Sequence, residues 1–155
     1  MKSKTIILAL FLMVSIYSFS QQFSLGERLS LSSNKFKLLG RSSSTNVSTY
    51  KYIGAITDTY FYNRKIGEII VGIKNGIVVT KIYNLIPENG DYGVPQSMLD
   101  LIQNAIGFPL SKRKDFYGAN VDDMTITVSR SNNELTFNKD RIMFFTSVKN
   151  SLLTQ

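Results

Sequence analysis

The middle of the chain has the clearest alternation of apolar and polar positions, and it predicts a β-meander. Aromatic and β-branched residues, which favour the pleated surface of a sheet, dominate the stretch Tyr50–Tyr62. Two more such runs, Ile66–Ile73 and Ile77–Ile86, are separated by a short turn that contains Asn75 and Gly76. Asn-Gly between two apolar runs indicates a tight hairpin, because both residues tolerate a positive φ. We therefore predict strands in all three runs and a hairpin between the last two.

Two other stretches space their apolar residues three and four positions apart, as on one face of a helix. They are Ser24–Gly40 and Ser97–Gly107, and each ends in a glycine that suits the end of a helix. Pro95 suits the first turn of the second helix because it has no N–H to lose there, and Pro109 prevents continuation of that helix. We predict one helix in each stretch.

The last third of the chain predicts three shorter strands after a basic loop at Ser111–Lys114. The strands are Asp122–Arg130, Asn133–Asp140 and Arg141–Val148, and they are separated by polar turn residues.

Two short phrases occur twice and suggest an internal repeat. The phrase aromatic-X-Gly-Ala-X-X-Asp occurs in KYIGAITD (Lys51–Asp58) and again in DFYGANVD (Asp115–Asp122). The stretches Ser30–Gly40 and Ser97–Gly107 also match, since both begin with serine and end in an aliphatic residue and glycine. Coincidence is the alternative, because these residue types are common. We interpret the pattern as two tandem units, at about 23–86 and 94–148.

These elements predict an α+β fold. Each unit would be a helix followed by an antiparallel meander, with the helices packed on one face of the sheet, because that arrangement buries the apolar side of both elements. Residues 21–155 have the length of one domain, which the two units would form together.

This arrangement resembles the β-lactamase-inhibitor-protein fold, a group that includes the inhibitors and small outer-membrane lipoproteins of the barrel-assembly machinery. The opening FSLGERLSL and the later LLG, within Phe23–Gly40, are similar to the start of such units. The resemblance would cover Phe23 to about Val148, and it implies a fold and a binding role. The chain departs from the group because it has no cysteine, and therefore neither a disulfide nor a lipidation site.

Residues 1–20 have the three parts of a secretory signal peptide. Lys2 and Lys4 precede an uncharged apolar run, and Ser18 and Ser20 occupy the small-residue positions before a cut at Gln21. The alternative is an uncleaved membrane anchor, but the apolar run is shorter than the roughly 20 residues that a membrane span requires. We predict a periplasmic or secreted protein with no stable membrane anchor after cleavage.

Charge and composition limit the function. The net charge is +7, and it is +5 without Lys2 and Lys4 because the first 20 residues contain no acidic residue. A mildly basic exported protein suits a protein partner or an anionic envelope component, and nucleic acid is not expected. The chain has no histidine and no cysteine, which excludes Ser-His-Asp and Cys-His catalysis and zinc sites built from those residues. We predict no cofactor and no metal.

The candidate binding residues are aromatic or basic. Exposed tyrosines are frequent anchors in protein interfaces, and the basic loop could contact an anion. The candidates are Tyr52, Tyr60, Tyr62, Lys112, Arg113 and Lys114. Strand alternation would place Tyr60 and Tyr62 on one face and Phe61 in the core.

We predict an exported, non-enzymatic binding or accessory protein of a bacterial-type cell envelope. It would contact a protein partner through its sheet face or its loops. One alternative is a small hydrolase that uses carboxylates such as Asp58, Asp122 or Glu134. Another is a structural surface protein that assembles through its sheet edges.

Overall fold

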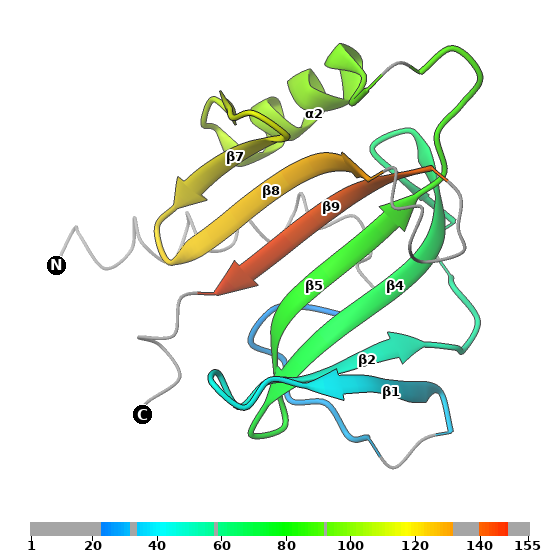
Figure 1. The fold of residues 1–155 in the computed structure, drawn as a ribbon, viewed down its shortest axis with the longest axis vertical. Coiled ribbons are helices and arrows are strands. Elements are labelled where there is room, and N and C mark those ends of the chain that lie inside the picture. The colour runs from blue at the N-terminus through cyan, green and yellow to red at the C-terminus, as the bar shows by residue number, and fades with distance from the viewer. Residues whose placement is uncertain (1–22, 32–33, 58, 92, 132–139, 149–155) are drawn as a thin grey trace, which may run out of the picture.

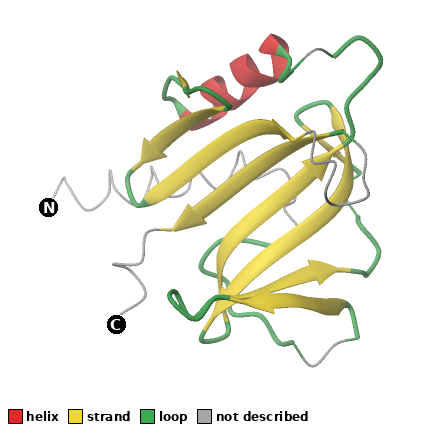
Figure 2. Cartoon of the chain, in the orientation of Figure 1, coloured by secondary structure: helices red, strands yellow, loops and turns green. Residues whose placement is uncertain are grey.

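The computed structural model describes residues 23–31, 34–57, 59–91, 93–131 and 140–148. In these residues a nine-stranded antiparallel sheet carries one helix along its side (Figures 1 and 2). The strands are β1 (Phe36–Arg41), β2 (Ser48–Tyr52), β3 (Tyr60–Phe61), β4 (Arg64–Lys74), β5 (Ile77–Leu85), β6 (Ser111–Lys112), β7 (Phe116–Val121), β8 (Met124–Ser131) and β9 (Arg141–Val148), and the helix is α2 (Gln96–Ile106).

The sheet consists of two meanders that meet in the middle. The strand order is β1-β2-β4-β5-β9-β8-β7-β6, and β3 pairs with β4 beside this path. The last strands of the two meanders, β5 and β9, pair with each other from Thr80↔Ser147 to Leu85↔Ile142. The outer edges are therefore formed by β1 at one end and by β6 and β7 at the other.

The predicted hairpin is confirmed. Asn75 and Gly76 join β4 to β5, and both have a positive φ, 52° and 78° respectively. The predicted second helix is also confirmed as α2, which ends at Gly107 in the left-handed conformation with φ 71°. The Gly107 N–H donates to the Gln103 carbonyl oxygen at 2.9 Å, so the glycine closes the helix.

One face of the sheet forms the core. The apolar face of α2 contributes Met98, Leu99 and Ile102, which are buried with sheet residues such as Val128 and Phe144. The N-terminal segment 23–31 covers another part of the same face and is bonded to the start of β5. The Gly26 N–H donates to the Val78 carbonyl at 2.8 Å, and the Val78 N–H donates to the Glu27 carbonyl at 2.9 Å. The opposite, outer face holds partly exposed residues such as Thr127 and Phe145.

The predicted fold class is wrong. The protein is mostly antiparallel sheet, and the part of Ser24–Gly40 that the structure describes is not helical. Phe36–Arg41 forms β1, and Arg28 makes an isolated antiparallel bridge with Ile77. The helical spacing was misleading because Phe36 sits on the core side of an edge strand, where pairing with Tyr52 of β2 satisfies the main chain.

The segments that suggested an internal repeat do not have the same local structure. Ser30–Gly40 contains a strand where Ser97–Gly107 contains a helix. Gly54 lies in the loop after β2, whereas Gly118 lies within β7. The phrases nevertheless share a packing motif, in which an aromatic ring lies over the glycine two residues later. A Cβ atom at Gly54 would overlap the Tyr52 phenol, and one at Gly118 would lie 3.2 Å from the Phe116 ring.

Several boundaries differ from those predicted. The strand over Tyr50–Tyr62 is divided, because β2 ends at Tyr52 and β3 contains only two residues. The short strand β6 and the strand β7 were not predicted, while β8 and β9 confirm two of the predicted strands. The predicted signal peptide and most of the predicted strand Asn133–Asp140 lie outside the described residues. Within the described part of the chain, no helix has the length and apolarity required to cross a bilayer.

Candidate functional site

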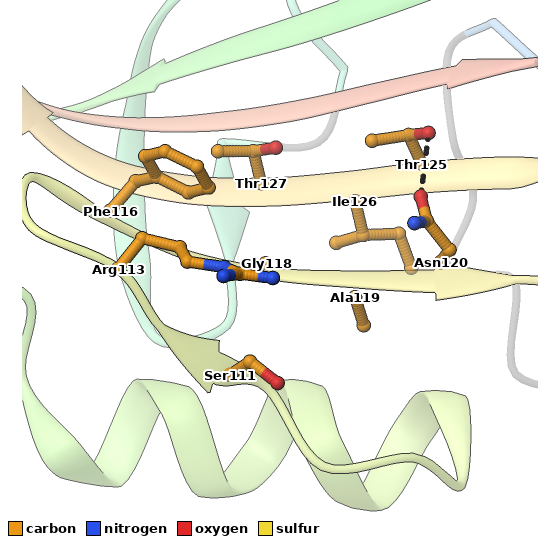
Figure 3. Close-up of a pocket in the computed structure, with 9 residues that line it drawn as sticks. All are labelled: Ser111, Arg113, Phe116, Gly118, Ala119, Asn120, Thr125, Ile126 and Thr127. Atoms are coloured by element: carbon orange, nitrogen blue, oxygen red, sulfur yellow. Dashed lines mark hydrogen bonds between the residues drawn. The ribbon is translucent and has the colours of Figure 1, made fainter.

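A hollow of about 360 Å³ lies at the β6–β7–β8 end of the sheet (Figure 3). Its lining combines an aromatic ring, a guanidinium group, hydroxyls and an amide, supplied by Ser111, Arg113, Phe116, Gly118, Ala119, Asn120, Thr125, Ile126 and Thr127. No carboxylate belongs to this lining.

Two tight hairpins build the hollow. The first joins β6 to β7 around Lys114 and Asp115, and it is closed by the Arg113 N–H, which donates to the Phe116 carbonyl at 2.7 Å. The second joins β7 to β8, where Val121 pairs with Met124 across a two-residue turn. Because side chains alternate along a strand, Phe116, Gly118 and Asn120 all fall on the outer face of β7.

Phe116 supplies an aromatic surface to the hollow. Its ring lies over Gly118, which has no side chain to displace it, and about 40% of the residue remains exposed. A ring that is supported from below and open above offers a flat contact for the apolar part of a ligand.

The polar groups of the hollow come from Arg113 and from the facing strands β7 and β8. The Arg113 side chain extends along β7 toward Gly118 (Figure 3). The Thr125 hydroxyl donates to the Asn120 side-chain oxygen at 2.9 Å, which fixes the orientation of that amide. Thr127 lies directly opposite Gly118 in the ladder and adds a second hydroxyl.

The β6–β7 hairpin is basic overall, with three basic residues and one acidic residue, Asp115. Lys112 and Lys114 flank Arg113 in the same hairpin and are exposed. The Lys112 ammonium lies 6.0 Å from the centre of the Tyr117 ring. An arginine fork next to hydroxyl and amide groups suits a carboxylate or another planar anion. The lining thus offers one cation, one aromatic ring and several hydrogen-bonding groups to a ligand.

The structure separates the predicted basic residues from the predicted tyrosines. Arg113 lines the hollow, whereas the tyrosines belong to β2, to β3 and to the turn after β3. Tyr52 is buried, and its ring centre lies 5.0 Å from that of Phe23. Tyr60 is 64% exposed.

Tyr62 does not follow the alternation that we predicted for it. Phe61 is buried as expected, but Tyr62 has a φ of 45° in the turn before Arg64, so its side chain leaves the strand pattern. Its ring packs 4.5 Å from that of Phe61 and 5.9 Å from that of Phe144. Burial raises the pKa of the Tyr62 phenol. Of the three tyrosines, only Tyr60 presents a largely exposed side chain.

The carboxylates of the alternative hydrolase are not assembled into a site in the described part of the chain. Asp122 occupies the turn between β7 and β8 with a φ of 52° and does not line the hollow. Asp58 and Glu134 lie outside the described residues. No cluster of three or more acidic residues suited to a metal ion occurs among the residues that the structure describes.

Sequence reasoning missed Phe116, Asn120, Thr125 and Thr127. The stretch from Phe116 to Val128 is a strand, an Asp-Asp turn and a second strand, whereas the sequence pattern predicts only one strand here, over Asp122–Arg130. Reading Asp122 and Asp123 as a two-residue turn would have revealed the hairpin and placed these four side chains on one face.

Comparison with known proteins gives no match: no protein-family model, no curated protein and no solved structure corresponds to this chain. The resemblance to the β-lactamase-inhibitor-protein fold therefore stays a prediction.

Proposed function

We propose that this protein is an exported, non-enzymatic binding protein of a bacterial-type cell envelope. Its hollow would hold a carboxylate side chain from a protein partner. The observation that carries the proposal is the lining itself, in which the Arg113 guanidinium and the Phe116 ring lie among hydroxyl and amide groups without any carboxylate.

The size of the hollow favours a side chain over a cofactor. Small-molecule sites occupy roughly 300–1,000 Å³ and enclose most of their ligand. At about 360 Å³, this open hollow is at the lower end of that range. A glutamate side chain could pair its carboxylate with Arg113 while its methylene groups rest on the Phe116 ring.

The proposed export rests on residues 1–20 alone. Their charged start, apolar middle and small residues before Gln21 suit a cleaved signal peptide. The absence of cysteine removes lipid attachment through a cysteine near the cut.

Assembly through sheet edges is less well supported, because both edges carry positive charge. Lys37 and Arg41 lie in β1, and Lys112 lies in β6 with Arg113 and Lys114 in its hairpin. Like charges oppose the pairing of one edge with the other in a second copy.

The proposal can be tested with the full-length chain expressed in a bacterial host and purified after export. Mass spectrometry should find an N-terminus at Gln21, and a product that keeps Met1 would contradict the export proposal. Binding should then be followed by NMR titration with a threonine-rich peptide that carries one central glutamate, and with its glutamine counterpart.

We expect the glutamate peptide to bind at least about tenfold more tightly than the glutamine peptide, which corresponds to about 1.4 kcal/mol. Arg113→Gln should remove this preference, whereas Lys65→Gln, which removes one exposed charge on β4, should retain it. Equal affinity for the two peptides, or an unchanged preference in Arg113→Gln, would overturn the proposal.

A further inference from the structure

We propose that the partner segment binds as an extended strand that adds to the outer edge of β7, next to the end of β6. This inference rests on the proposed function, and it specifies the form of the ligand and the main-chain groups that hold it.

The β7–β8 hairpin determines where the main-chain groups of β7 point. Val121 and Met124 close a two-residue turn, so their main chains bond to each other, and the bonded pairs recur at every second residue. The N–H and C=O groups of Tyr117 and Ala119 therefore also point toward β8. The N–H and C=O groups of Phe116, Gly118 and Asn120 point away from β8, to the outer edge of the sheet.

Strand β6 meets only part of this outer edge. Arg113 bonds to Phe116, and Ser111 pairs with Gly118, which accounts for the first two outward-facing residues of β7. The third is Asn120, whose main chain lies beyond the end of β6. Among the described residues, no main-chain group outside β7 and β8 forms a hydrogen bond with the Asn120 N–H or C=O.

The sequence explains why β6 stops at this point. Continuing the Ser111↔Gly118 register by two residues would place Pro109 opposite Asn120. Proline has no N–H and cannot donate to the ladder. The Leu110 N–H, which the alternation directs away from β7, donates to the Gln103 side-chain oxygen at 2.8 Å. The edge of β7 at Asn120 is thus left without a donor from the residues before β6.

The hollow lies at this same edge. Its lining includes Ser111 and Arg113 from the β6 hairpin and Asn120 from the part of β7 beyond the end of β6 (Figure 3). A peptide residue paired with Asn120 would place its side chain on the outer face of the sheet, beside Asn120. Asn120 and Gly118 are neighbouring outer-face positions of β7. The Arg113 guanidinium extends toward that position (Figure 3).

The occupant is therefore an extended peptide with an acidic residue opposite Asn120. The peptide N–H of that residue would donate to the Asn120 carbonyl, and its carbonyl would accept from the Asn120 N–H. Main-chain bonds supply affinity in this mode of recognition, while the side-chain pocket supplies specificity. A second copy of the chain is disfavoured as the occupant, because both of its own sheet edges are basic.

Backbone methylation of the peptide tests the strand geometry separately from the charge recognition. In the single-glutamate peptide, methylation of the glutamate amide should weaken binding at least about tenfold. Methylation of the next amide, which would point away from β7, should change the affinity of the peptide less than about twofold. On the protein side, hydrogen exchange of the Asn120 amide should slow when the peptide binds, while the Gly118 amide, already paired with β6, should change little.

Failure of this inference differs from failure of the proposed function. If both methylated peptides bind like the parent and Asn120 exchange is unchanged, while the glutamate preference still requires Arg113, strand addition is overturned and carboxylate binding stands. If the glutamate preference itself is absent, both proposals are overturned.

Discussion

The phenol ring of Tyr52 lies over the backbone of Gly54, and its hydroxyl donates to the Ala55 carbonyl at 3.2 Å. Tyr52 is buried against Phe23 and Phe36, so the ring has little freedom to move away. The glycine is required here because any β-carbon at this position would overlap the ring.

Gly54→Ala should therefore destabilise the protein by about 1–3 kcal/mol, the usual cost of inserting a group into a packed region. Chemical denaturation of the variant and of the wild type gives the difference in unfolding free energy. Gly40→Ala is the matched control, since a Cβ atom there meets open space and its φ is not positive. Equal stability of the two variants would contradict the assigned role of Tyr52.

Gly118→Ala should act on binding more than on stability. A Cβ atom there would lie 3.2 Å from the edge of the Phe116 ring and 3.3 Å from the Ile126 carbonyl oxygen. The exposed ring can shift by the few tenths of an ångström required, and the carbonyl contact needs a similarly small adjustment of β8. We expect weaker binding of the glutamate peptide together with a change in unfolding free energy below about 1 kcal/mol. A variant that binds as tightly as the wild type would show that the ring position is unimportant.

Acid should weaken the attachment of the loop between β5 and α2. Arg64 donates to both carboxylate oxygens of Asp91, at 3.0 and 3.1 Å, and both side chains are largely buried. Burial alone would raise the pKa of Asp91, but hydrogen bonds from Arg64 and the Glu88 N–H, with the charges of Arg64 and Arg130, hold it below its ordinary value. The carboxylate thus stabilises the fold above its unfolded-state pKa, and this contribution is lost as the pH falls through the folded-state pKa.

Asp91→Asn should lower the unfolding free energy at pH 7 by about 2 kcal/mol, because it removes the carboxylate that accepts two hydrogen bonds from the largely buried Arg64 and leaves only Glu88, 3.4 Å away, as a charged partner. The variant should also lose less stability than the wild type between neutral and strongly acidic pH. Denaturation curves over that range measure both effects. Asp123→Asn, in an exposed turn, is the control and should match the wild type. An acid response of Asp91→Asn equal to that of the wild type would contradict the prediction.

The buried amine of Lys81 should produce the opposite pH dependence. Burial lowers the pKa of Lys81 to about 8 despite the nearby charge of Glu27, and its ammonium donates to the Phe23 carbonyl at 3.0 Å. Between about pH 8 and the unfolded-state pKa near 10.5, the unfolded chain binds more protons than the folded chain. Folding stability from this group should therefore rise with pH across that window.

Lys81→Met should remove this rise. The difference in unfolding free energy between the variant and the wild type should shift with pH by up to about 3 kcal/mol across the window. Comparing the two proteins cancels the titration of the tyrosines. A difference that stays constant with pH would show that Lys81 titrates normally.

The positive charge at both sheet edges should keep the protein monomeric. From Arg28 to Thr57 the sequence contains five basic residues and no acidic one. Light scattering should report a monomer for the wild type at low salt. A Lys35→Glu and Lys37→Glu double variant should associate, because an acidic β1 edge would complement the basic β6 hairpin and such a head-to-tail contact can repeat. Dimers or filaments of the wild type would contradict the prediction.

Local sequence determined the elements whose conformation depends on a few neighbouring residues. Asn75 and Gly76 fix a hairpin because both tolerate a positive φ, and the three-and-four spacing of apolar residues before Gly107 predicts α2. The phrase that occurs twice also has a local cause, since an aromatic ring can fold over a glycine two residues later in a loop or in a strand.

Tertiary structure decided the rest. Phe36–Arg41 became a strand because β2 offered a partner for its main chain, which no local pattern records. Tyr62 packs against Phe144, which lies 82 residues later in the sequence, because the turn before Arg64 takes its side chain out of the strand alternation. The hollow exists because two hairpins bring Arg113, Phe116 and Thr127 together and because Pro109 ends β6, so it depends on pairings between strands rather than on any single stretch of sequence.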